Sequence, residues 1–144
     1  MAVEFAVVAP VLLAIVVGLI ELSRVYNAQN LLQTAAREGA RFASMDRAGM
    51  LSDGETANAK LENDVKNYLA STGMDRDSID VQILDHDNPD QTFNLDDPAN
   101  DLKLFDVTIE APYSSVSYTP VPENNDYTLT ASITFRNGRL TYSD

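Results

Sequence analysis

The feature that most constrains this chain is an apolar run near its N-terminus. From Phe5 to Ile20 the sequence reads FAVVAPVLLAIVVGLI, sixteen residues without a charge. A helix that crosses the hydrocarbon core of a bilayer needs about 20 apolar residues, and residues 1–20 reach that length if Glu4 is tolerated. A secretory signal peptide has basic residues before its apolar core, whereas the first Arg here is Arg24. The run predicts a membrane-inserted or assembly-buried helix; the alternative is a core helix of a soluble domain.

Glu4 is the one charge inside this apolar segment. A carboxylate in an apolar helix is costly unless it is paired, which makes it a functional candidate. Three interpretations stay open from the sequence. Glu4 sits at the level of the lipid headgroups, or it stabilises the positive end of the helix dipole, or it pairs with a cation of another subunit, such as a free N-terminal amine.

The helical pattern continues well beyond the apolar run. Apolar and small residues recur at spacings of three and four up to Phe42, which is one face of a helix. We therefore predict a single helix over residues 2–44, roughly 60 Å long. Pro10 and Gly18 are its weak points, because a proline deletes a backbone hydrogen bond and should kink or loosen the rod. Small side chains let another element approach closely, and we predict that they pack on the rest of the chain; they are Ala35, Ala36, Gly39, Ala40 and Ala43.

The remainder of the chain reads as a short helix and several strands. Ser52 and Glu55 have the spacing of a capping box, an apolar stripe from Leu61 to Leu69 follows, and Gly73 is a plausible stop. Period-two alternation around residues 79–83, 105–110 and 127–136 predicts strands. Asn137-Gly138 is a hairpin signal, with residues 140–142 returning as a short edge strand. We predict an α+β fold in which the long helix packs on a small antiparallel sheet with one short second helix.

Charge divides the chain into the same two parts. Residues 1–44 hold three acidic and three basic residues, so their net charge is zero. The whole chain has 22 acidic and 10 basic residues, and residues 45–144 therefore carry the entire net charge of −12. We expect a long hydrophobic and amphipathic helix over residues 1–44 and an acidic globular domain over 45–144, exposed to solvent. Such a charge repels phosphate and argues against nucleic acid as a partner.

The chain also contains two polar loops and few candidate catalytic residues. Residues 85–101 contain six Asp, but the spacing does not fit an EF-hand, and a solvated acidic loop is favoured over a calcium site. Residues 113–122 read YSSVSYTPVP, which suits an exposed loop better than an O-glycan acceptor. The chain has no Cys and a single His, His86, and no nucleophile elbow or phosphate-binding loop. We therefore expect no enzyme activity, no cofactor and no metal.

Residues 3–44 resemble the TadE-like family, pilin-like proteins of the tight-adherence pilus machinery within the type IV filament superfamily. The resemblance rests on Val3-Glu4-Phe5-Ala6, a proline in the apolar run, the segment GLIELSR from Gly18, and AAREGARFA from Ala35 to Ala43. It implies a precursor held in the bacterial inner membrane, cleaved by a prepilin peptidase and extracted by a pilus assembly platform into a filament on the cell surface. In type IV pilins a Glu near the mature N-terminus pairs with the amine of a neighbouring subunit, and Glu4 corresponds to it. No basic leader precedes the apolar run, so we expect a processed chain; Glu4 lies one residue early for the family.

The expected function is a structural pilin-like subunit that polymerises with copies of itself through its N-terminal helix. The alternatives are a minor pseudopilin that primes assembly, and a membrane-anchored periplasmic or surface binding module. We assign the assembly surface to Glu4, Phe5, Pro10 and Gly18.

Overall fold

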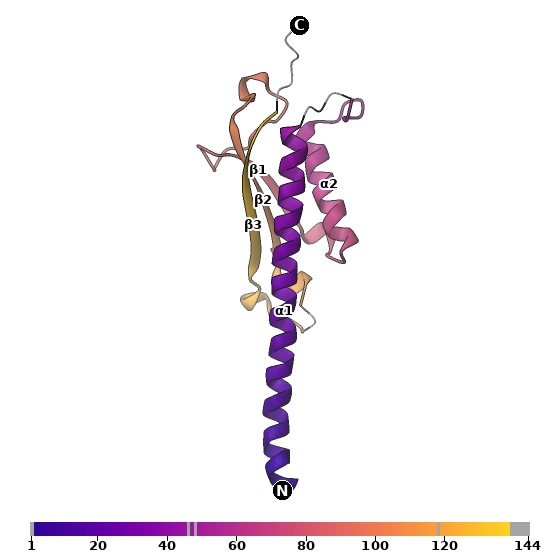
Figure 1. Cartoon of the computed structure of the whole chain (residues 1–144), viewed down its shortest axis with the longest axis vertical. Coiled ribbons are helices and arrows are strands. Elements are labelled where there is room, and N and C mark those ends of the chain that lie inside the picture. Colours follow the sequence, from indigo (N-terminus) through magenta and orange to yellow (C-terminus); the bar gives the residue numbers. More distant parts are fainter. Residues whose placement is uncertain (1, 46, 48, 118, 139–144) are drawn as a thin grey trace.

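The computed structural model describes residues 2–45, 47, 49–117 and 119–138. It contains a long helix α1 (Ala2–Ser44), a shorter helix α2 (Ala57–Ser71), and strands β1 (Asp80–Asp85), β2 (Leu104–Pro112) and β3 (Thr128–Arg136) (Figure 1). Single turns of 3₁₀ helix punctuate the connections, at Arg76–Ser78, Pro98–Asn100, Tyr113–Ser115 and Glu123–Asn125. The predicted α+β fold, with one long and one short helix and an antiparallel sheet, is confirmed.

Helix α1 runs without interruption from Ala2 to Ser44, with Pro10 inside it. Pro10, which was expected to kink or loosen the rod, does not end the helix. A proline removes only one donor from the helix, and the hydrogen bonds on either side of it keep the rod continuous.

At the C-terminal end of α1, the buried guanidinium of Arg47 donates hydrogen bonds to Ala43 O and, at 2.8 Å, to Leu95 O. A cation at this position satisfies a terminal carbonyl and complements the helix dipole.

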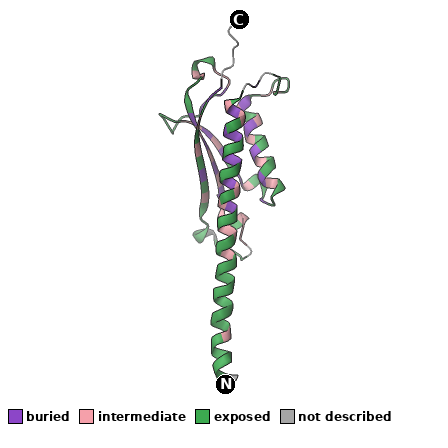
Figure 2. Cartoon of the chain, viewed as in Figure 1, coloured by how far each residue is buried: buried purple, intermediate pink, exposed green. Residues whose placement is uncertain are grey.

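The three strands form one antiparallel sheet in the order β1-β2-β3, with Ile83 opposite Val107 and Val107 opposite Ile133. One face of the sheet is apolar and is covered by the helices: α1 packs on β3 and β2, and α2 packs on α1 and β1. Figure 2 shows the buried residues where these elements meet. The alternation of apolar and polar residues in each strand produces this one-sided burial, because successive side chains point to opposite faces.

Helix α2 begins later than its sequence suggests. Ser52 N does donate to Glu55 Oε2 at 3.2 Å, but the N-cap is Thr56, whose side chain accepts from Ala59 N at 3.2 Å. Gly54 lies between them with a φ of 81°, a left-handed conformation that a right-handed helix cannot include. The Ser52–Glu55 pair therefore closes a turn ahead of the helix. At the other end, the helix stops before Gly73 as expected, and Gly73 has a φ of 98°.

The end of β3 is tied to the end of α1. Asn137 is 1% exposed, its N–H donates to Lys103 O at 2.9 Å, and Gly138 N donates to Ala43 O at 3.1 Å. A Cβ at Gly138 would lie 2.7 Å from Met45 O, so this close approach requires glycine. The return strand predicted over residues 140–142 lies outside the described residues.

Gly39 sets how closely α1 and α2 approach. A Cβ placed on Gly39 would lie 2.9 Å from Val65 Cγ2 and 3.3 Å from Leu61 Cδ2, so a side chain here requires Val65 and Leu61 to shift. Gly18 on the same helix has no atom within 4 Å of the equivalent position. The two glycines therefore provide a matched pair for testing the packing of α1.

We expect Gly39→Leu to lower the free energy of unfolding by about 1–3 kcal/mol, because overpacking displaces Val65 and Leu61. Gly18→Leu should not lower the free energy of unfolding, because its side chain enters open space. Leucine also has a higher helix propensity than glycine. Thermal unfolding of both full-length variants in detergent, followed by circular dichroism, measures the difference. An unchanged melting curve for Gly39→Leu would show that this face of α1 is not closely packed.

Candidate functional site

The first half of α1 projects from the domain as an exposed apolar rod, which we define as residues 3–20 (Figure 2). Exposed fractions of its large apolar side chains range from 49% at Val17 to 77% at Val3. The helix is long and apolar enough to cross a membrane, and none of its most apolar window is buried within the chain. A soluble monomer rarely presents so large a contiguous apolar surface, which marks an interaction with a membrane or a protein.

The residues predicted to act in assembly all lie on this rod. Glu4 is in the first turn of α1, where its negative charge suits the positive end of the helix dipole. Phe5 is 72% exposed, and Pro10 and Gly18 are exposed farther along. The structure does not gather these four residues into one cluster. They are spread along the rod, so together they define a length of apolar cylinder rather than a pocket.

The residues predicted to pack the helix lie in its second half and face inward. Ala35 and Ala36 are each 1% exposed, and Ala40 and Ala43 are fully buried. Gly39 contacts α2, as described above. The same helix therefore presents two surfaces in sequence: an exposed apolar cylinder, and then a stripe of small residues against the sheet and α2.

A group of polar contacts holds α1 at the point where it leaves the domain. Tyr113 Oη donates to Glu21 Oε2 at 2.9 Å, and Ser117 Oγ donates to the same oxygen at 3.2 Å. Arg24 donates to the carbonyl of Val116. We call these five residues the junction clamp. Sequence reasoning did not find it, although Glu21 and Arg24 are the first two charges after the apolar run.

The loop that supplies the clamp is itself fixed by hydrogen bonds. Ser114 donates to both carboxylate oxygens of Asp126, from its N–H at 2.8 Å and its hydroxyl at 2.6 Å. Tyr113 N donates to Tyr127 O at 2.6 Å. One and a half turns farther along α1, Gln29 Nε2 donates to Thr130 O at 2.6 Å. The serine-rich segment that the sequence suggested was an exposed loop therefore positions the rod relative to the sheet.

The acidic loop uses its carboxylates to shape the chain. Asp85 Oδ1 accepts from the N–H groups of Asp87 and Asn88, at 2.8 and 3.2 Å. Asp96 Oδ2 accepts from Ala57 N at the start of α2, at 2.7 Å. These are turn and capping interactions. Within the described residues, no three acidic or histidine side chains are grouped closely enough to hold a metal ion.

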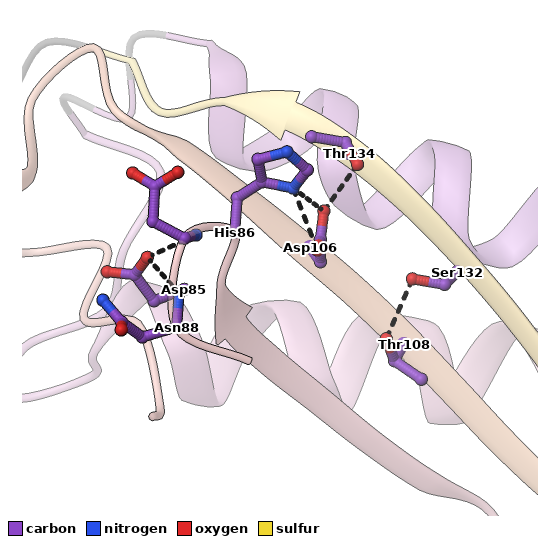
Figure 3. A network of polar contacts seen from close by, with 8 residues as sticks. Asp85, His86, Asn88, Asp106, Thr108, Ser132 and Thr134 are labelled. Atoms are coloured by element: carbon purple, nitrogen blue, oxygen red, sulfur yellow. Dashed lines mark hydrogen bonds and ion pairs between the residues drawn. The ribbon is translucent and has the colours of Figure 1, made fainter. Parts of the chain in front are cut away.

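His86 belongs to a polar ladder on the outer face of the sheet (Figure 3). Its Nδ1 lies 3.1 Å from both carboxylate oxygens of Asp106, and Thr134 Oγ1 donates to Asp106 at 2.6 Å. The neighbouring pair, Thr108 and Ser132, share a hydrogen bond of 2.9 Å. Both partners of Asp106 hydrogen-bond to its carboxylate, so Thr134 donates its hydroxyl to the acid and not to the histidine. In a hydrolase triad the hydroxyl of the nucleophile hydrogen-bonds to the histidine, and the histidine hydrogen-bonds to the acid. The arrangement of Thr134, His86 and Asp106 is therefore not a triad.

The fold thus combines a long helix that is exposed and apolar over its first half with an antiparallel sheet on which its second half packs. Residues 1–41 match the model of the family described as TadE-like protein, which confirms the resemblance read from the sequence motifs. The match covers the rod, the two α1 residues of the junction clamp and most of the small-residue stripe. No curated protein and no solved structure matches the chain.

The junction clamp leads to a prediction about local stability. We expect Tyr113→Phe to speed amide hydrogen exchange in residues 20–26, because it removes a hydrogen bond to a charged group, an interaction worth about 1.5–3 kcal/mol. Hydrogen–deuterium exchange with mass spectrometry in detergent measures this. Tyr68→Phe is the control, since Tyr68 lies on α2 away from the clamp. Equal exchange in the two variants would show that the clamp does not hold α1.

Proposed function

We propose that this protein is a structural, pilin-like subunit that polymerises through its N-terminal helix into an extracellular filament of the tight-adherence, type IV pilus-like kind. The observation that carries the proposal is the rod. It is an ordered helix, apolar on every side, attached to a folded acidic domain. Its TadE-like match supports the same class of protein.

The apolar surface of the rod requires a non-aqueous environment. Exposed apolar surface costs about 25 cal/mol for each Å² left in water, and large apolar residues surround the rod on all sides. A bilayer provides one such environment, and a bundle of the same helices provides another. We propose that the subunit moves from the first to the second, so that helix–helix contacts in the filament core replace lipid contacts.

The distribution of charge suits this arrangement. An unpaired charge at a close-packed filament axis would be costly, and residues 5–20 carry none. The domain, with the net charge of −12, would form the outer surface, where like charges keep neighbouring filaments apart and soluble. Cohesion between subunits would therefore come from the rod. By the family resemblance, a prepilin peptidase and an assembly platform would act on the membrane-held precursor.

Glu4 is the charged exception on the rod, and its variants test the proposal. We expect Glu4→Leu to abolish or strongly reduce filaments while the domain keeps its melting temperature, because a neighbouring subunit would lose its carboxylate partner. Glu4→Asp should retain more assembly than Glu4→Leu, since it keeps the charge. Electron microscopy and immunoblotting of sheared surface material measure filament yield.

A carboxylate on the domain provides the matched control. Glu62 lies on α2 and pairs with Lys66 at 2.7 Å, so Glu62→Leu removes the same charge away from the rod and should leave filament yield unchanged. Normal filaments from a Glu4→Leu strain would contradict the pairing of Glu4. If the protein remains entirely in the membrane fraction, it is a permanent anchored module; if filaments contain it in only a few copies, it is a minor pseudopilin.

A further inference from the structure

We propose that Tyr26, Tyr113 and Tyr127 form a tyrosine collar that seats the domain in the headgroup layer of a bilayer whose lipids carry no net charge, while the rod spans the hydrocarbon core. This inference rests on the membrane-held stage of the proposed function. It adds a lipid-contacting surface on the domain itself, separate from the rod.

The three tyrosines lie at the end of the domain from which the rod projects. The junction clamp ties Tyr113 to Glu21 of α1 at 2.9 Å. Tyr113 N donates to Tyr127 O at 2.6 Å, and the two rings have centroids 6.5 Å apart. Tyr26 lies on α1 between the clamp and Gln29, which contacts β3. The collar therefore occupies the level of α1 residues 21–29, a rise of about 12 Å at 1.5 Å per residue. Figure 1 shows the loop that supplies Tyr113 and the start of β3 at this level.

The length of the rod places this level at a membrane boundary. Residues 2–20 of α1 rise about 28 Å, which matches the hydrocarbon core of a bilayer, about 30 Å thick. When these residues span the core, Glu21 and Arg24 emerge on the side of the domain. The headgroup layer that follows is about 5–8 Å deep, so it overlaps the part of the collar's level that lies nearest the junction clamp.

The exposure of the collar distinguishes it from the rest of the domain. Tyr127 is 69% exposed and Tyr26 is 67% exposed. Among the described residues beyond the rod and its last exposed turn at Leu22, no other large apolar side chain exceeds the 48% of Met50. Tyrosine concentrates at membrane interfaces, because its ring contacts the acyl boundary while its hydroxyl remains hydrated. The rings of Tyr26 and Tyr127 are mostly exposed, so this environment is available to both of them beside the rod.

Charge selects the type of lipid. The collar lies beside Asp126, which is exposed and accepts hydrogen bonds from Ser114, and it belongs to a domain that carries the chain's full net charge of −12. A surface of anionic lipids repels such a domain. A zwitterionic surface, such as phosphatidylcholine, presents no net charge and accepts the tyrosine hydroxyls.

The experiment uses the absence of tryptophan from the chain. Single-tryptophan variants of the full chain, Tyr127→Trp and Tyr26→Trp, are reconstituted in phosphatidylcholine vesicles that contain lipids brominated either near the headgroup or near the bilayer centre. Leu12→Trp, in the middle of the rod, reports the centre of the bilayer, and Tyr68→Trp, on α2, reports the solvent side. Thermal unfolding confirms that each variant is folded.

We expect the shallow bromines to quench Tyr127→Trp and Tyr26→Trp several-fold more than they quench Tyr68→Trp, and the deep bromines to quench only Leu12→Trp strongly. If Leu12→Trp is quenched as expected but Tyr127→Trp and Tyr26→Trp behave like Tyr68→Trp, the collar is wrong and the membrane-held stage stands. If the deep bromines quench the two collar positions as strongly as Leu12→Trp, the collar is also wrong, because the domain then sits too deep. If neither set of bromines quenches Leu12→Trp, the proposed membrane-held stage is wrong, and the proposed collar is wrong with it.

Discussion

The structure depends on the burial of small side chains along one half of a single helix. Ala35, Ala36, Ala40 and Ala43 occupy little volume, so the backbone of α1 lies close to the sheet, and Gly39 lets α2 approach from the side. This packing anchors the second half of α1 in the domain. Because the helix continues without interruption, the anchored half also holds the first half in position, although the large apolar side chains of residues 3–20 are exposed. The packing of the second half of α1 therefore fixes the direction of residues 3–20.

The sequence was informative wherever structure follows from a local period. The spacing of small residues up to Ala43 predicted the end of α1, and the alternation around Val107 and Ile133 predicted two of the strands. Both patterns arise because one face of an element meets the core. The start of α2 was misplaced, since the capping-box spacing of Ser52 and Glu55 is also satisfied by a turn, and the left-handed conformation of Gly54 cannot be read from spacing alone.

Local sequence patterns could not predict the junction clamp. It joins Glu21 to Tyr113 and Ser117, which are 92 and 96 residues away along the chain. Nothing in the periodicity of either segment indicates the other, and both hydroxyl donors lie in a segment that the sequence suggests is an exposed loop. The spacing of the acidic loop favoured a solvated loop over a calcium site, but its part in capping α2 through Asp96 depends on a distant pairing that spacing does not reveal. The assignment of Glu4, Phe5, Pro10 and Gly18 to assembly remains a prediction.

The domain is fastened to α1 at both ends of their shared length. The clamp and Gln29 hold one end, while Gly138, Asn137 and Arg47 join the last turn of α1 to the end of β3 at the other. A pull along the rod is therefore applied nearly parallel to the strands of the sheet (Figure 1). In this direction the fastenings and the packed alanine stripe share the tension and must give way together by shear, whereas a pull at right angles would peel them apart one at a time. The attachment between the domain and α1 therefore resists a force along the rod better than the same force applied across it.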